Sequence, residues 1–345
     1  MNPDPKPSQP HTYTETVELK TVIKNKSSQN LLDFLSRRFH YLTPAQWRER
    51  ILDGRVTVNE RAASEGQPLR AGDVVRYWTT PWAEPEVRRD YRVVYEDSTI
   101  FVVSKPAPLP VHAIGAYFKN TLLSILRKDI PEAEAYQLVH RLDAETSGLL
   151  LLVKDKSLVY PFQKMWSRDG LSPSPLAGEG GVRGAGDFVR KSYRAIVFGR
   201  FASTQKRFEG PIGSDRESAV RMKLKVDREK GKPSVTEFEL LETKGNFSLV
   251  EARILTGRTH QIRVHLEHLG HPIVGDKLYS GSDETFLHFY EKGWDEWLQQ
   301  KVILPRMALH ACRLEFTHVK TGEKMVFEDP MTEDLMAFWN GLSAV

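Results

Sequence analysis

The sequence predicts a mixed α and β protein built from two domains. Segments with apolar residues at helical spacing occur along the chain between segments in which apolar and polar residues alternate, as in half-buried strands. The length of 345 residues suits two domains, or one large domain with an appendage. Residues 79–90 carry prolines and several charges and interrupt these patterns, so we interpret them as a linker.

The composition is typical of a soluble globular protein, with 40% hydrophobic and 27% charged residues. The net charge of +4 is compatible with a polyanionic partner. The single cysteine, Cys312, excludes an internal disulfide and fits a reducing compartment. No apolar stretch approaches the length of a membrane span. Residues 1–28 are polar and proline-rich without an apolar signal core, which predicts a flexible leader and a cytoplasmic protein with no membrane association.

Residues 29–78 are predicted to form a small α/β domain. Leu31, Leu32, Leu35 and Phe39 share one face of a first helix. Thr43-Pro44 is typical of the start of a second helix, which Asp53-Gly54 ends. Two short alternating segments follow, and we expect strands at residues 55–59 and 74–77.

Residues 91–345 are predicted to form the larger domain. Strands are expected at 91–97, 100–103, 189–199, 232–241 and 247–255, and helices at 121–127, 158–166, 286–302 and 332–342. Residues 171–186 are rich in glycine, proline, alanine and serine, and we expect a disordered insertion there. A phosphate-binding loop is disfavoured, because the segment lacks a Gly-Lys-Ser/Thr ending and a preceding strand.

Residues 140–153, HRLDAETSGLLLLV, place a polar half directly before an apolar half. The run from Gly148 to Val153 predicts a strand buried on both faces, or part of a core helix. Arg141 and Asp143 then lie at the mouth of that buried element. The carboxylate is therefore either a positioned catalytic group or half of an ordinary Arg–Asp pair that caps a strand.

This stretch resembles the signature of the RluA family of RNA pseudouridine synthases. Further segments resemble motifs of that family and occur in the family's order: KPAPLPVH at 105–112, KSYRAIVFG at 191–199, TGRTHQIRVHL at 256–266, GHPIVGDKLY at 270–279 and MALHACRLEF at 307–316. The chain departs from the family at Pro108, Ala113 and Val319. The resemblance implies an α+β fold around a mixed, largely antiparallel central sheet with flanking helices, and an active site in a basic cleft.

The order of elements in residues 29–78, with DGRVTVN and AGDVVRYW, resembles the S4-type RNA-binding domain. That module presents a basic helical face to structured RNA. The candidate RNA-binding residues here are Arg37, Arg38, Arg48, Arg50 and Arg55, since guanidinium groups suit phosphate geometry. The alternative is that these arginines only form a solvated face.

The resemblance also implies the roles of individual residues. The family's catalytic aspartate falls on Asp143, its active-site tyrosine on Tyr193 and its active-site arginine on Arg263. Arg263 would hold the Asp143 carboxylate in an ion pair, and Tyr193 would stack on uracil. The remaining candidates for contact with the substrate are Arg141, which would replace the extruded base, and His140, Lys105 and Leu309.

The implied reaction is the isomerisation of specific uridines to pseudouridine in structured RNA, with ribosomal RNA favoured over transfer RNA. The target base must leave its stack to be reached. Because the isomerisation involves no net redox change, we expect no cofactor. We also expect a monomer without an obligate protein partner.

Three alternatives compete with this interpretation. The density of histidines at His260, His265, His268 and His271 could suggest a metal site, but ligand spacings are missing and we expect no metal. A hydrolase using Ser147, His140 and Asp143 would need a Gly-x-Ser-x-Gly elbow, which is absent from the sequence. A catalytically silent RNA-binding protein or RNA chaperone is disfavoured, because the three expected active-site residues are all present.

Overall fold

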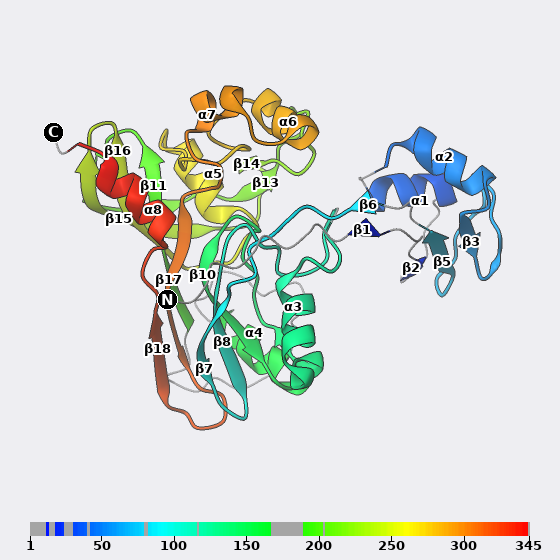
Figure 1. The fold of residues 1–345 in the computed structure, drawn as a ribbon, viewed down its shortest axis with the longest axis horizontal. Helices are drawn as coiled ribbons and strands as arrows, with labels where there is room; N and C mark the ends of the chain where they lie inside the picture. Colours follow the sequence, from blue (N-terminus) through cyan, green and yellow to red (C-terminus); the bar gives the residue numbers. More distant parts are fainter. Residues whose placement is uncertain are drawn as a thin grey trace. The chain divides into compact units, whose positions relative to one another are not determined.

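The computed structural model describes residues 12–13, 18–23, 30–39, 42–78, 82–115, 117–166, 189–202 and 204–343. The chain divides into two compact units (Figure 1). The first unit is Met1–Glu86 with His112–Ser124, and the second is Val87–Val111 with Ile125–Val345. The predicted insertion at 171–186 lies outside the described residues. Within these described ranges, no helix is long and apolar enough to cross a membrane.

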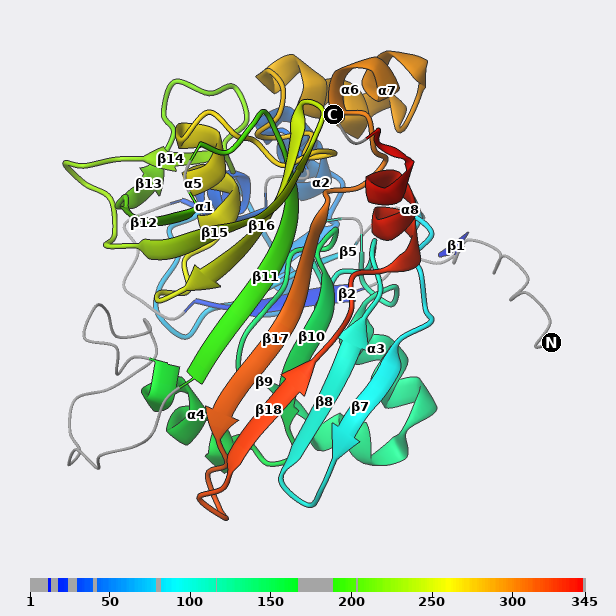
Figure 2. The same ribbon diagram turned by 90° about the vertical axis from the view of Figure 1, so that its left-hand side faces the viewer.

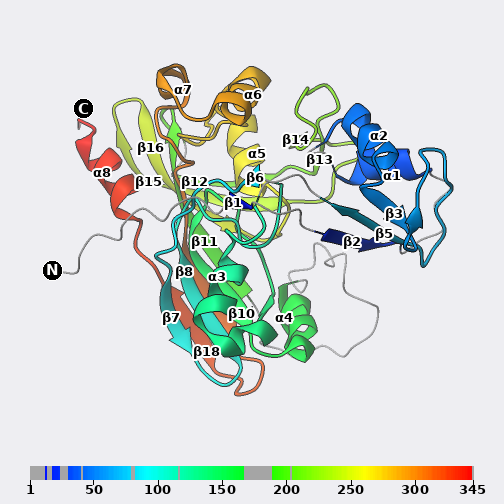
Figure 3. The same ribbon diagram turned by 45° about the vertical axis from the view of Figure 1, so that its right-hand side comes forward.

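In the first unit two helices lie against a four-stranded antiparallel sheet (Figure 3). The sheet order is β2-β5-β3-β4, and the elements are β2 (Glu18–Val22), α1 (Leu31–Arg38), α2 (Pro44–Leu52), β3 (Val56–Val58), β4 (Arg61–Ala62) and β5 (Val74–Trp78). A separate pair joins β1 (Thr12–Tyr13) to β6 (Trp82–Ala83). The predicted start of α2 is confirmed, because Thr43 Oγ1 accepts from the Gln46 N–H and Gln46 Oε1 accepts from the Thr43 N–H.

The core of the first unit forms between the helices and the sheet. Leu31 and Leu35 of α1 and Trp47 of α2 are fully buried, at 0% exposure. The Trp47 ring meets the Tyr77 ring of β5 edge-on, with centroids 5.2 Å apart. The apolar face predicted for the two helices is therefore the face that packs on the sheet.

The predicted leader extends too far, whereas the division between the two units, after Glu86, falls within the predicted linker. The predicted leader at 1–28 contains β2, which pairs with β5 along its whole length and continues to the buried Ile23. The predicted linker at 79–90 contains Glu84, whose buried carboxylate accepts the backbone N–H groups of Lys119 at 2.8 Å and Asn120 at 2.6 Å. These hydrogen bonds tie the end of the first segment of the unit to its second segment.

The second unit is built on a ten-stranded sheet (Figure 2). The main order is β12-β15-β16-β11-β17-β10-β8-β7, with β18 paired to β17 and β9 to β10. The strands are β7 (Arg92–Glu96), β8 (Ile100–Lys105), β9 (Gln137–Leu138), β10 (Ser147–Val153), β11 (Val189–Phe198), β12 (Gln205–Glu209), β15 (Val235–Lys244), β16 (Phe247–Ile254), β17 (Leu309–Thr317) and β18 (Lys324–Glu328). Among the described strand pairs only β10 and β17 run parallel, so the predicted mixed, largely antiparallel sheet is confirmed.

The parallel contact between β10 and β17 depends on Gly148. Its φ is +106°, and a Cβ atom there would lie 2.3 Å from the carbonyl oxygen of Ala311. Only glycine tolerates both the dihedral angle and this approach. The apolar run after Asp143 is thus the central strand β10, every residue of which is buried.

Helices flank this sheet. They are α3 (Leu122–Asp129), α4 (Val159–Trp166), α5 (Gln261–His268), α6 (Asp283–Lys292), α7 (Glu296–Val302) and α8 (Glu333–Gly341). A separate hairpin, β13 (Ile212–Ser214) with β14 (Leu224–Val226), packs on α5. The single helix predicted at 286–302 is wrong: Gly293, at φ +78°, ends α6, and the Asp295 side chain caps α7 by accepting the Leu298 N–H.

Candidate active site

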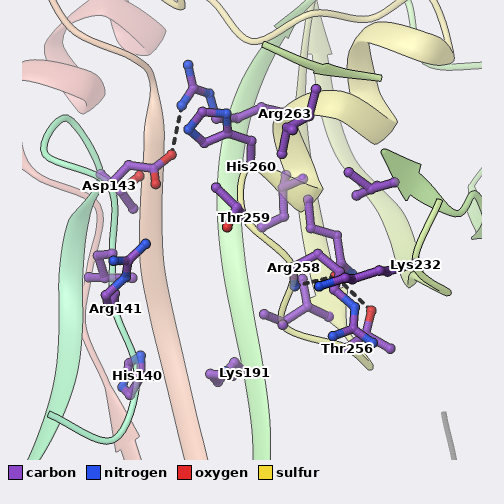
Figure 4. A pocket seen from close by; sticks show the side chains of 18 of the residues that line it. His140, Arg141, Asp143, Lys191, Lys232, Thr256, Arg258, Thr259, His260 and Arg263 are labelled. Atoms are coloured by element: carbon purple, nitrogen blue, oxygen red, sulfur yellow. Dashed lines mark hydrogen bonds and ion pairs between the residues drawn. The ribbon is translucent and has the colours of Figure 1, made fainter. Parts of the chain in front are cut away.

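A pocket of about 920 Å³ opens in the second unit beside the start of β10 (Figure 4). Its walls come from the loop before β10, from β11, from the β13–β14 hairpin and from the loop that leads into α5. Seven cationic side chains but only two carboxylates line it within the described part of the chain: Arg141, Lys191, Arg216, Lys230, Lys232, Arg258 and Arg263 against Asp143 and Asp227. The pocket is therefore suited to an anionic ligand.

Asp143 is held by Arg263 from α5. The Arg263 Nη1 donates to Asp143 Oδ2 at 2.8 Å, which is the contact predicted from the sequence. Burial opposes ionisation of Asp143, but the charge and hydrogen bond of Arg263, with His260 nearby, hold the pKa of that carboxyl below its usual value. About a third of the Asp143 side chain, 34%, stays exposed, so the carboxylate is both charged and accessible.

Arg263 is in turn fixed by a residue that the sequence analysis did not assign. Its Nε and Nη2 donate to the two oxygens of Asp276, at 2.7 and 2.9 Å. The Asp276 side chain is fully buried and also accepts the backbone N–H groups of Leu278 and Tyr279. This two-pronged pair leaves Nη1 as the nitrogen that points at Asp143. The signal was present in the sequence, since Asp276 belongs to the quoted GHPIVGDKLY segment.

His260 lies next to this cluster, in the left-handed conformation at φ +55° directly before α5. The hydroxyl of Tyr279 accepts the Leu224 N–H at 3.0 Å and lies 3.0 Å from His260 Nδ1. Burial, with repulsion from Arg263, lowers the pKa of His260 to about 4, so the ring is neutral at pH 7. The hydrogen bond between the Tyr279 hydroxyl and His260 Nδ1 fixes the orientation of the ring beside Arg263.

The structure brings most of the predicted active-site residues to the same pocket. Asp143, Arg263, Tyr193, Arg141, His140 and Leu309 all line it. Tyr193 on β11 faces Ala311 of β17, and burial with the nearby Asp143 charge raises the pKa of its hydroxyl. Tyr193 therefore keeps its proton at neutral pH. Arg141 is exposed, whereas His140 Nε2 accepts the Leu151 N–H at 3.1 Å.

Lys105 does not lie in the pocket, so its predicted contact with the substrate is wrong. Its side chain is fully buried, and Nζ donates to the carbonyl oxygens of Pro106, Leu109 and Ala144 at 2.9, 2.8 and 3.2 Å. Burial, with Arg306 nearby, lowers the pKa of Lys105 to about 7. The lysine joins the loop after β8 to the residue that follows Asp143, so its contribution is structural.

Among the five arginines predicted to bind RNA, Arg50 is the exception. It is buried, and its Nη1 donates to the Trp78 carbonyl at 2.8 Å, which ties α2 to β5. Arg37, Arg38, Arg48 and Arg55 are exposed. Arg48 pairs with Glu65 at 2.8 Å, an exposed ion pair that water screens.

The geometry does not support a serine hydrolase. Ser147 is 0% exposed, and its Oγ lies 3.0 Å from His310 Nδ1 rather than beside His140. His310 is equally buried, so no substrate reaches the pair. Among the histidines considered as metal ligands, His265 is buried with both ring nitrogens engaged, by Thr236 Oγ1 and by the Gly210 carbonyl.

The arrangement offers an ionised and accessible carboxylate, a rigidly held guanidinium beside it and an aromatic ring, all in a cationic pocket. Such a site can attack or deprotonate a sugar while it holds a polyanionic chain. The fold and the site define an enzyme that acts on a polyanionic chain, and the buried Ser147 does not support a serine hydrolase.

Comparisons with known proteins agree. Residues 99–268 match the family model described as RNA pseudouridylate synthase. The chain is 31% identical to ribosomal large subunit pseudouridine synthase C of Escherichia coli (strain K12), over 94% of this chain and 96% of that protein. It is 33% identical to ribosomal large subunit pseudouridine synthase D of Neisseria meningitidis, over 83% and 71%. The solved structure of human RNA pseudouridylate synthase domain containing 1 matches with a TM-score of 0.52 and 26% identity, over 74% of this chain and 89% of that one.

The chain is therefore an RNA pseudouridine synthase, an isomerase. It belongs to the RluA family, as the sequence motifs predict.

Proposed function

We propose that this enzyme isomerises specific uridines of ribosomal RNA, with Asp143 as the catalytic residue. The observation that carries the assignment of Asp143 is its position: an ionised carboxylate in a cationic pocket, bound by an arginine that a buried aspartate fixes. Ribosomal RNA is supported by the names of the two bacterial relatives, which are large subunit pseudouridine synthases.

In the proposed reaction the bond between ribose C1′ and uracil N1 breaks, the base turns, and a bond from C1′ to uracil C5 forms. The proton on C5 is lost and N1 gains one, so atoms and electrons balance without a redox partner. The Asp143 carboxylate either attacks C1′ or removes the neighbouring sugar proton, and both routes need the ionised form. The low pKa of Asp143 supplies that form at neutral pH.

The other pocket residues then take supporting roles. Arg263 holds the carboxylate and balances its charge through the 2.8 Å hydrogen bond. Tyr193, protonated and largely buried, supports the turned base by stacking. Arg141, exposed at the rim, replaces the extruded uridine in the RNA stack. Leu309 packs behind the base from β17.

The first unit is proposed to be an S4-like RNA-binding module. Its two helices on a small sheet agree with that class of domain. The RNA-contacting face is assigned to the exposed arginines Arg37, Arg38, Arg48 and Arg55, and Arg50 is left out because it is buried.

The test is tritium release from RNA labelled at uracil C5, since that hydrogen leaves only when the base is rejoined through C5. Ribosomal and transfer RNA pools from cells that lack the protein are assayed separately. Release from ribosomal RNA alone is expected. Release only from transfer RNA would contradict the proposed substrate while leaving the isomerase activity in place.

A further inference from the structure

The pocket has a second polar end, away from Asp143. Figure 4 shows Asp143, His260 and Arg263 together at one end, and Lys232 and Arg258 at the other. The volume of about 920 Å³ lies near the upper limit for sites that bind one small molecule. A single uracil with its ribose therefore leaves room in the pocket for a neighbouring part of the RNA strand.

Arg258 is held in this second end without a neutralising carboxylate among the described residues. Its Nε donates to the Pro233 carbonyl at 3.1 Å, and its backbone N–H donates to Gln261 Oε1 at 3.0 Å. Its Nη2 is buried and has no hydrogen-bond partner within the described part of the chain. A buried charged donor without an acceptor is unfavourable, so an anion that accepts from this guanidinium would be bound strongly.

Two lysines add positive charge beside Arg258. Lys232 is exposed, and Lys191 Nζ lies 4.0 Å from where a Cβ atom of Gly257 would lie. Burial lowers the pKa of Lys191 to about 8, which keeps it mostly charged at neutral pH. One further carboxylate besides Asp143, that of Asp227, lines the pocket within the described residues, but its Oδ1 already accepts two backbone N–H groups. Lys191 and Lys232 thus add to the positive charge that Arg258 brings to the pocket wall.

We propose that Arg258, Lys191 and Lys232 form an anion subsite that binds a phosphodiester group of the RNA strand next to the target uridine. The inference rests on the proposed function, because the ligand is the backbone of the RNA substrate. Guanidinium and ammonium groups bind phosphate oxygens through charge-assisted hydrogen bonds. A phosphate held here fixes the register of the strand, so that one particular ribose stops beside Asp143.

The test measures affinity in an Asp143→Asn background, in which binding is separated from turnover. The probe is the heptanucleotide r(AAAUAAA), whose single uridine sets the register, with one neutral methylphosphonate placed at each linkage in turn. We expect the methylphosphonate at one linkage next to the uridine to lower affinity by about tenfold, the usual scale for one charge-assisted contact. Arg258→Met is expected to cause a similar loss with the unmodified probe and no further loss at that linkage.

Salt dependence gives a second readout. Arg258→Met should reduce the slope of log affinity against log salt by about 0.7, the value for one phosphate of a single strand. Arg253→Met is the matched control, since Arg253 on β16 is exposed and paired with Glu239 and Glu251 at 2.9 and 3.0 Å. It should leave the affinity and the slope unchanged.

If the losses of affinity from Arg258→Met and from the methylphosphonates add at every linkage, or if no linkage is sensitive, the assignment of the subsite is wrong. Lys232→Met serves as the second variant should Arg258→Met unfold. In Lys232→Met, the methylphosphonate at the sensitive linkage should lower affinity less than it does in the parent protein. Failure of the proposed function is seen separately, in the tritium release of the unaltered enzyme. If no tritium is released from ribosomal RNA but one linkage is still sensitive to the methylphosphonate, the subsite is retained and the assigned RNA is wrong.

Discussion

Replacing Arg263 with methionine removes the cation that the site is built around. The side chain makes one hydrogen bond to Asp143, at 2.8 Å, and two to the buried Asp276. A hydrogen bond to a charged group contributes about 1.5–3 kcal/mol, which corresponds to about 10- to 150-fold in rate. Because a third of the Asp143 side chain is exposed and water screens the pair, we expect the lower end, a loss of about tenfold.

The same change should alter the dependence of the rate on pH. Arg263 favours the ionised form of Asp143, so its removal raises the pKa of that carboxyl, and the acidic limb of the rate profile moves to higher pH. Single-turnover tritium release at saturating RNA, measured from about pH 4 to about pH 8, gives both quantities. Arg263→Lys keeps a cation and should keep the limb nearer its original position.

Stability must be separated from chemistry in this experiment. Arg263→Met leaves Asp276 buried without its cation, which costs about 3–5 kcal/mol. The double variant Arg263→Met/Asp276→Asn removes the stranded charge and should recover part of the stability but none of the rate. A full rate for Arg263→Met, with the acidic limb unmoved, would refute the role assigned to the arginine.

Three further predictions concern the scaffold. In the folded protein Lys105 has its pKa lowered to about 7, whereas in the unfolded chain it keeps its proton up to about pH 10.4, so the stability of wild type relative to Lys105→Met should rise with pH between these values. Denaturation of both proteins at about pH 7 and about pH 9.5 tests this. A difference in stability that stays constant between the two pH values would contradict it. Gly148→Ala should destabilise more than Gly245→Ala, because both have positive φ but only Gly148 meets a carbonyl within 2.3 Å, and thermal unfolding of the two variants would show equal losses if this is wrong. Arg37→Ala should weaken RNA binding without loss of stability, whereas Arg50→Ala should lower stability without weakening RNA binding. Filter binding and melting curves measure the two quantities. A binding defect confined to Arg50→Ala would contradict the assignment of Arg37 to the RNA-contacting face.

The parts of the fold that local patterns determine could be predicted from the sequence. The cap at Thr43 and the apolar run from Gly148 indicate their elements directly, because capping and burial depend on neighbouring residues. The predicted leader extends too far along the chain, since the alternation of Leu19, Thr21 and Ile23 is short and polar enough to resemble a coil. Gly293, a helix-ending residue, is the signal missed within 286–302.

The site residues were predicted from motifs. The predictions that failed depend on burial, which motifs do not show. Asp143 and Arg263 lie 120 residues apart, and no spacing rule joins them; the family pattern did. That pattern could not tell that Lys105 points into the protein rather than into the pocket. Its ammonium group binds the nearby carbonyls of Pro106 and Leu109 and also that of Ala144, which only the fold brings close. The fixing of Arg263 by Asp276 was missed for the same reason, as it depends on the packing of α5 against the segment that follows.

Asp143 is proposed to perform the chemistry. The most direct measurement compares tritium release by Asp143→Asn with that by Glu145→Gln, on ribosomal RNA and with affinity measured in parallel. Glu145 is the matched carboxylate two residues away, which binds Lys277 Nζ at 2.6 Å and the Met307 N–H at 3.0 Å instead of facing the pocket. We expect Asp143→Asn to bind RNA and release no tritium, while Glu145→Gln releases it. Release by Asp143→Asn at the wild-type rate would contradict the catalytic role proposed for Asp143.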